Sequence, residues 1–253
     1  MQAKASLEDT LALMRDLRAR CDWDAAQTHQ SLRPYLIEEA HEVDDALRLG
    51  NDGMLRDELG DLLLQVLFHS VIAEERGAFD LHDVAGALIA KMTQRHPQLY
   101  GDGEAIPWER QKAKTRVSLA DGLPMELPGL HRAHRLQDRT AGVGFDWDDV
   151  AGPLAKVREE VDEVAAEIEQ PHPDSASAQD ALEGELGDLL FAVVNLCRKA
   201  NVHAAVAMDR ANLKFVRRFT SLEKLALERG VNVGTATLAE LDLLWDDVKR
   251  AGG

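Results

Sequence analysis

Aromatic residues are scarce in this sequence, and their scarcity bears on the fold class. Phenylalanine, tryptophan and tyrosine together make up 5% of the 253 residues, whereas hydrophobic residues as a whole make up 45%. The apolar content is therefore mainly alanine, leucine and valine. Sheet proteins are richer in β-branched and aromatic residues, while alanine and leucine favour helices. We expect an all-α fold.

Cysteine and long apolar runs are also lacking. Cys21 and Cys197 are too few for a disulfide framework, and neither has a partner at the spacing of a zinc site. No apolar run reaches the length that spans a membrane, and the first residues lack the apolar core of a signal peptide. We therefore expect a reducing, cytoplasmic setting.

Positive charge is the third shortage. The chain has 29 lysines and arginines against 45 aspartates and glutamates, for a net charge of -16. Such a surface repels nucleic acid and anionic lipid, so we expect neither nucleic acid nor a membrane as a partner. A small polyanion could bind only where a cation and nearby basic side chains make the local electrostatic potential positive.

Helical periodicity runs through most of the chain. Ser6 and Asp9 form a capping pair before the first apolar repeat, and Gly50 is typical of a helix end. Glycine and proline interrupt the pattern over 99–129, which predicts a linker with at most a short helix around 109–116. Helices are expected near 7–18, 31–50, 51–77, 80–96, 130–141, 152–169, 178–199, 203–229 and 238–249, with a proline-containing loop at 170–177.

The two halves repeat the same motifs in the same order. The six residues Glu58–Leu63 recur unchanged at Glu185–Leu190. Three further pairs of segments match: 21–24 with 145–148, 38–42 with 159–163, and the pair Lys91 and Arg95 with the pair Lys214 and Arg218. Repetition of several landmarks indicates internal duplication. We predict two tandem helical-bundle domains, at 1–98 and 130–253, joined by the linker 99–129.

Acidic residues at helical spacing suggest a metal site in each copy. Glu160 and Glu163 are three residues apart, as are Glu185 and Asp188, so each pair shares one face of a helix. If the two helices pack together, four carboxylates converge, and their repulsion is relieved by a divalent ion such as Mg²⁺. A solvated acidic face is the simpler alternative. The apolar neighbours of Glu185 and Asp188, and a glycine inside both matching helices (Gly60, Gly187), favour the metal site.

Basic and aromatic residues near these carboxylates are candidates for nucleotide contacts. Lys214 and Arg218 are four residues apart and could bind phosphate oxygens, while Lys156 lies one turn before Glu160. A surface salt bridge is the alternative for such a pair. Trp245 could stack on a base, although a tryptophan in a terminal helix is usually a packing residue. Trp23 and Trp147 occupy matching positions and are expected to pack, bordering the site.

The pattern Glu-Glu-x-x-Glu followed by Glu-x-x-Asp resembles the MazG-type nucleoside triphosphate pyrophosphohydrolases. The resemblance covers nearly the whole chain, including the tandem arrangement. It implies hydrolysis of nucleoside triphosphates to monophosphate and pyrophosphate with Mg²⁺, or Mn²⁺ as a substitute, in a homodimer. By match, the metal ligands are Glu160, Glu163, Glu185 and Asp188 in the second copy, and Glu39, Glu42, Glu58 and Asp61 in the first.

The same resemblance assigns the remaining site residues. The matched nucleotide contacts are Lys156, Lys214, Arg218 and Trp245, with Lys91 and Arg95 in the first copy. Tyr35 stands where the second copy has Lys156, and no tryptophan clearly replaces Trp245, so we expect the first copy to be weaker or mainly structural. As a mechanism, Glu159 or Glu160 would accept a proton from the attacking water; attack at the α- or at the β-phosphorus gives the same products.

Two other classes of function remain open. A helical dimer could bind a nucleotide or a partner protein without turnover, as a regulatory module. All eight carboxylate positions are present, which favours the enzyme. A purely structural bundle would leave the repeated charged positions without a reason.

Overall fold

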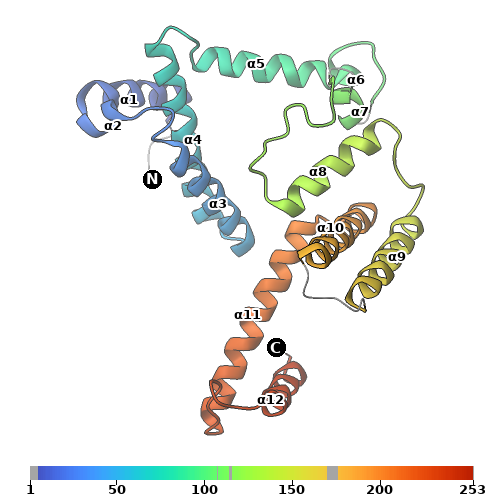
Figure 1. Cartoon of the computed structure of the whole chain (residues 1–253). Helices are drawn as coiled ribbons and strands as arrows, with labels where there is room; N and C mark the ends of the chain where they lie inside the picture. Colours follow the sequence, from blue (N-terminus) through green and yellow to red (C-terminus); the bar gives the residue numbers. More distant parts are fainter. Residues whose placement is uncertain (1–4, 107, 114–115, 170–175, 253) are drawn as a thin grey trace. The chain divides into compact units, whose positions relative to one another are not determined.

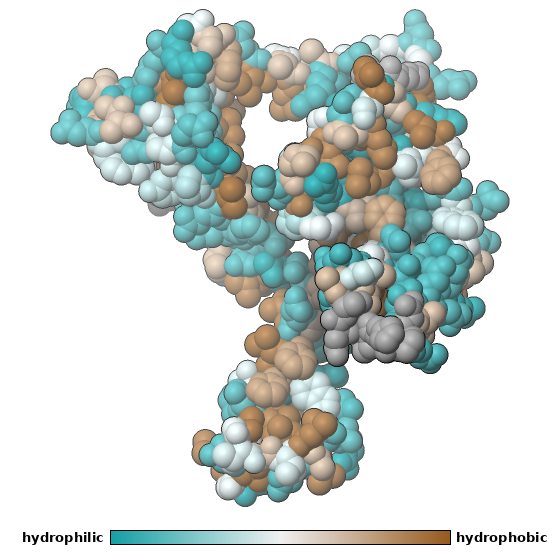
Figure 2. Space-filling model, in the orientation of Figure 1, coloured by the Kyte–Doolittle hydropathy of each residue, from teal (hydrophilic) through white to brown (hydrophobic). Residues whose placement is uncertain are grey.

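The computed structural model describes residues 5–106, 108–113, 116–169 and 176–252. Across these residues it has twelve helices and no strand, so the all-α prediction is confirmed. The chain divides into two compact units, Met1–Ala105 and Ile106–Gly253 (Figure 1). Many apolar side chains lie at the surface of both units (Figure 2). Within the described ranges no single helix has the length and hydropathy to cross a bilayer, while α10 and α11, bent by 103° at their junction, meet the criterion only jointly.

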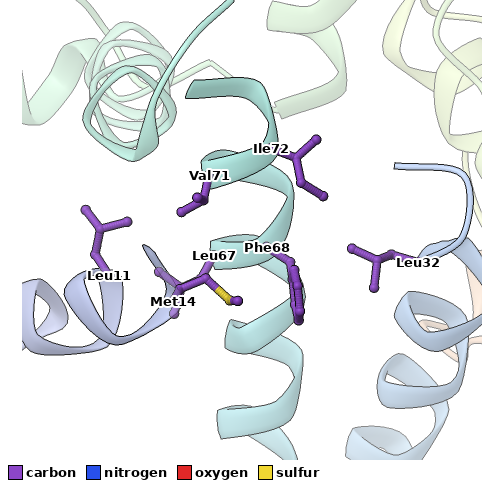
Figure 3. Close-up of a cluster of buried hydrophobic side chains, with 7 residues drawn as sticks. All are labelled: Leu11, Met14, Leu32, Leu67, Phe68, Val71 and Ile72. Atoms are coloured by element: carbon purple, nitrogen blue, oxygen red, sulfur yellow. The ribbon is translucent and has the colours of Figure 1, made fainter. Parts of the chain in front are cut away.

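The first unit is a small bundle built around one long helix. Its core joins Leu11 and Met14 of α1 to Phe68 and other residues of α4, and Leu32 closes it just before α3. In Figure 3, the α1 side chains approach α4 from one side and Leu32 from the other. The helices of this unit are α1 (Leu7–Arg20), α2 (Asp22–Ala26), α3 (Arg33–Leu49), α4 (Asp52–Glu75), α5 (Leu81–Gln94) and α6 (Pro97–Tyr100).

Local sequence sets the ends of these helices. Ser6 caps α1 and Asp80 caps α5, each through a capping box with an aspartate three residues later. Gly50 ends α3 with a φ of 64°, a left-handed conformation that suits glycine. The side chain of Asn51 then accepts hydrogen bonds from the backbone N–H groups of the first turn of α4.

The second unit repeats the pairing of long helices and adds a distal hairpin. α9 packs on α10, as α3 packs on α4 in the first unit. α12 folds back on the far end of α11, where Leu222, Ala226, Leu244 and Val248 form a buried cluster. The helices are α7 (Trp108–Ala113), α8 (Gly129–Gly142), α9 (Ala151–Ile168), α10 (Ala176–Lys199), α11 (Ala204–Glu228) and α12 (Leu238–Arg250).

The helices differ from expectation mainly around the predicted linker and loop. Two short helices, α2 and α6, were not expected. The short helix expected around 109–116 corresponds to α7, described from Trp108 to Ala113, which packs on α8; residues 107, 114 and 115 lie outside the described part of the chain. The loop expected at 170–177 is wrong at its end, because Ala176 and Ser177 already belong to α10; residues 170–175 lie outside the described part of the chain. The proposed boundaries at 98 and 130 stay a prediction.

Candidate metal and nucleotide site

The second unit brings three acidic side chains from two helices to one point. Carboxylate oxygens of Glu160 on α9 and of Glu185 and Asp188 on α10 all lie within 4.8 Å of one another. Glu160 is 4% exposed, whereas Asp188 faces solvent. The group is therefore open on one side, and its oxygens are the donors that hard divalent cations prefer.

Glu163 adjoins this group. A hydrogen bond between the Glu160 and Glu163 carboxyls raises the pKa of Glu163, and the charges of Glu160 and Glu185 raise it further. Negative charges this close together favour the neutral form of a carboxyl group, and a cation bound among them would relieve the repulsion. All four residues predicted as ligands in this copy therefore lie in electrostatic contact.

Lys156 is directed at the same carboxylates. Its Nζ lies 2.6 Å from Oε1 of Glu160 and 2.7 Å from Oε1 of Glu159. These hydrogen bonds, with Glu159 and then Glu160, raise the pKa of Lys156. They also lower the pKa of Glu160, because the adjacent ammonium stabilises the ionised carboxylate. The spacings of three and four residues on α9 make both contacts possible.

The first unit holds a similar group, with Tyr35 at the position that corresponds to Lys156. Carboxylate oxygens of Glu39 on α3, Glu42 on α3 and Glu58 on α4 lie within 4.8 Å of one another. The pKa values of Glu39 and Glu58 are raised, first by loss of hydration and then by neighbouring negative charges, including that of Asp61. The ring of Tyr35 packs edge-on against that of Trp23, with 6.3 Å between the two ring centroids.

The other predicted contacts lie on neighbouring helices. Lys214 is exposed on α11 and Arg218 is half-buried one turn later. In the first unit, Lys91 lies in the last turn of α5 and Arg95 caps its end. Thus Lys156 contacts the carboxylates directly. Lys214 and Arg218 lie on α11, the helix after α10, and Lys91 and Arg95 lie at the end of α5, the helix after α4.

Trp245 has a packing role in this structure. Its ring centroid lies 5.5 Å from that of Phe215, and it packs against the buried cluster between α11 and α12. The sequence allowed Trp245 either to stack on a base or to pack inside the protein, and its contacts in this structure are packing contacts.

A cavity of about 450 Å³ lies between α8, α10 and the segment that follows α8, and of its lining residues sequence analysis expected only Trp147 to border the site. Phe191 and Asn195 line it from α10, one and two turns after Asp188 on the same helix face. Gln137 and Trp147 line it from α8 and the following segment. Trp147 was expected to border the site, but a cavity between helices depends on tertiary packing, which spacing alone does not predict.

Comparisons with known proteins match both carboxylate groups. The MazG nucleotide pyrophosphohydrolase domain matches residues 27–100 and 152–224, and each segment contains one group. A protein of Escherichia coli strain K12 named nucleoside triphosphate pyrophosphohydrolase is 40% identical over 249 residues, covering 94% of this chain and 93% of that protein. The nucleoside triphosphate pyrophosphohydrolase/pyrophosphatase MazG of Thermotoga maritima is 39% identical over 98% of this chain and 97% of its own length.

A match over a shorter part of the chain links it to a third protein with the same kind of name. A nucleoside triphosphate pyrophosphohydrolase of Mycobacterium tuberculosis is 43% identical over 150 residues, which cover 55% of this chain and 46% of that protein. Trp245 lies outside both segments matched by the domain, whereas Lys156, Lys214 and Arg218 lie inside the second.

Proposed function

The chain belongs to the MazG nucleotide pyrophosphohydrolase family, and from this membership we propose that its second unit carries the main active site. The protein is a nucleoside triphosphate pyrophosphohydrolase, which converts a nucleoside or deoxynucleoside triphosphate and water to the monophosphate and pyrophosphate. The observation that carries the proposal is the convergence of Glu160, Glu185 and Asp188 beside Lys156.

The donor set fits a hard divalent cation, and we take Mg²⁺ as the ion, with Mn²⁺ as a substitute. Glu160, Glu163, Glu185 and Asp188 would hold it in the second unit, because carboxylate oxygens packed this closely repel one another without a positive charge. When bound, such an ion neutralises phosphate charge and lowers the pKa of a coordinated water.

The side chains of the second unit supply the remaining chemistry. Lys156, Lys214 and Arg218 would bind phosphate oxygens and stabilise the charge of the leaving pyrophosphate. Glu159 or Glu160 would accept a proton from the attacking water. Glu159 is the more exposed of the two, with 57% of its side chain open to solvent against 5% for Glu160. The proton therefore has a direct route from Glu159 to bulk water.

The cavity beside Asp188 is our candidate for the nucleobase. Trp147 and Phe191 supply flat apolar surface, and Gln137 and Asn195 supply amide groups for hydrogen bonding. Its position one to two turns beyond Asp188 on α10 suits a base attached to a triphosphate at the carboxylates. In this arrangement Trp245 packs against Phe215 and need not contact the base.

We further propose a cytoplasmic homodimer. Leu213, Phe215 and Val216 on α11 are 54%, 57% and 59% exposed. Apolar surface of this kind is usually covered by a partner. The first unit we propose to be weaker or mainly structural, since Tyr35 replaces the lysine that contacts Glu160.

Product analysis tests the proposal. Wild type, Glu185→Gln and Glu58→Gln are incubated with a panel of NTPs and dNTPs and Mg²⁺, and the phosphate products are separated. We expect monophosphate and pyrophosphate from wild type, loss of at least about a thousandfold in kcat for Glu185→Gln, and retained turnover for Glu58→Gln. No product from wild type on any nucleotide would reject the hydrolase and favour a binding or regulatory module; loss in both variants would make the first unit part of the active enzyme.

A further inference from the structure

The ammonium of Lys156 sits where the second carboxylate group needs a positive charge. It contacts Glu160, a side chain only 5% exposed, at 2.6 Å. Glu160 is also one of the three residues whose oxygens converge with those of Glu185 and Asp188. A divalent cation that binds this group must therefore either displace the ammonium from Glu160 or bind close to it against charge repulsion.

In the first unit, the position that corresponds to Lys156 carries no positive charge. Tyr35, four residues before Glu39, is neutral and packs edge-on against Trp23. The arginines of α3 and α4 contact other residues: Arg48 pairs with Asp44 and Asp45, Arg56 pairs with Asp57, and Arg33 donates a hydrogen bond to Gln30. Carboxylate oxygens of Glu39, Glu42 and Glu58 lie within 4.8 Å of one another. Loss of hydration and then neighbouring negative charges raise the pKa values of Glu39 and Glu58.

We propose that, without nucleotide, the first unit binds a divalent cation more tightly than the second, and that Lys156 makes metal binding in the second unit depend on the triphosphate. The inference rests on the proposed function, since it takes both groups to be metal sites. Each group lies on a pair of packed helices whose carboxylates are spaced three residues apart, although different members converge in the two units. We assign the difference in cation binding to one position, Tyr35 in the first unit and Lys156 in the second.

The triphosphate is what releases the lysine. An incoming nucleotide offers Lys156 phosphate oxygens in place of the carboxylates of Glu159 and Glu160, which leaves Glu160 able to bind the metal ion. Because binding free energies are reciprocal, the metal ion in turn strengthens nucleotide binding at the second unit. The first unit, which lacks the lysine, gains no such coupling and holds its cation whether or not a nucleotide is present.

Manganese binding to the full chain measures this difference directly. Mn²⁺ is titrated at pH 7.5 and free ion is followed by electron paramagnetic resonance, with calorimetry on the same samples. Glu58→Gln and Glu185→Gln assign each binding phase to a unit. We expect the tighter phase to disappear in Glu58→Gln, and the weaker phase, lost in Glu185→Gln, to tighten at least about tenfold with a nucleotide analogue that has a methylene group between its α- and β-phosphorus.

Reciprocal substitutions isolate the lysine. Lys156→Gln tightens the second-unit phase by about tenfold or more without nucleotide, and Tyr35→Lys weakens the first-unit phase by a similar factor. Lys249→Gln is the matched control: its lysine also pairs with an acid three residues away, Asp246, but on the exposed face of α12, and it leaves both phases unchanged.

Several outcomes overturn the inference. These are equal Mn²⁺ affinities in the two units, no Mn²⁺ binding to either unit, or a second-unit affinity that is the same in Lys156→Gln as in wild type. Hydrolysis assayed on the same preparations separates this inference from the proposed function. Turnover by wild type with unchanged affinities in the variants defeats the lysine argument alone, whereas absence of turnover defeats the proposed function.

Discussion

The carboxylate of Glu109 anchors α7 to α8, and its removal gives a stability prediction with a defined pH dependence. It accepts hydrogen bonds from Arg135 at 2.7 Å and from Arg116 at 3.0 Å, and Lys112 lies 3.4 Å away. Burial alone would raise the pKa of Glu109, but the two arginines overcome it and lower the pKa to about 2. The side chain is 14% exposed, so solvent screens the pairing only in part.

The magnitude follows from the difference between the folded and unfolded pKa. The ordinary value is 4.5 and the folded value is about 2, which corresponds to an upper limit of about 3 kcal/mol of stability at neutral pH. A glutamine at this position keeps some of the hydrogen bonds. We therefore expect Glu109→Gln to lower the free energy of unfolding of the second unit by about 2 kcal/mol at pH 7.

The pH dependence has a definite sign. Because the folded pKa is depressed, the contribution is complete above the unfolded value of 4.5 and is lost as the pH falls towards 2. Urea unfolding at pH 7, 5 and 3.5, followed by circular dichroism, should show a difference between wild type and variant that is constant from pH 7 to 5 and smaller at pH 3.5. Asp246→Asn, which breaks an ion pair whose acid is 57% exposed, is the control and should change stability by less than about 1 kcal/mol. A difference below about 0.5 kcal/mol at pH 7, or one that grows with acid, would refute the reasoning.

Three further predictions concern packing and caps. Phe68→Ala should destabilise the first unit by about 3–5 kcal/mol in urea unfolding, because the ring is 2% exposed in the core of that unit; a loss below about 1 kcal/mol would contradict that packing. Gly152→Ala would place a methyl group 2.3 Å from the Trp147 ring, so we expect a shift in tryptophan fluorescence and an altered ratio of kcat/KM between purine and pyrimidine substrates, and unchanged values for both would count against the base site. Thr237→Ala removes the capping box of α12 and should cost about 1 kcal/mol by thermal unfolding, whereas Thr235→Ala nearby should be close to neutral.

Sequence alone predicts the long helices because their signals are local. The capping boxes at Ser6 and Asp80 and the left-handed Gly50 depend on neighbouring residues only, and each ends or begins a helix as expected. The short helices α2 and α6 were missed, because segments of five and four residues are too short for an apolar period to stand out. Their existence depends on the packing of adjacent long helices.

The carboxylate site, too, is predicted from sequence only where its features are local. Spacing on one helix predicts that Glu185 and Asp188 share a face, and repetition predicts that the first unit has the same arrangement. Which residue neutralises the group depends on side-chain conformation: Lys156 was predicted to contact phosphate, and in the structure its ammonium contacts Glu160 at 2.6 Å. The cavity beside Asp188 likewise required three segments to be placed together.

The duplication shows why the same scaffold need not give the same activity. The two units share a helix pair, a glycine-containing Glu-Leu-Gly-Asp segment and a convergent acidic group, so the forces that build the scaffold act alike on both. In the second unit the residue four positions before Glu160, Lys156, is directed at the group rather than the core, because its Nζ reaches the carboxylate of Glu160; in the first unit the corresponding Tyr35 packs on Trp23. A substitution there costs the fold little and changes the charge of the site by one. Function is therefore free to diverge at this position while both bundles stay intact.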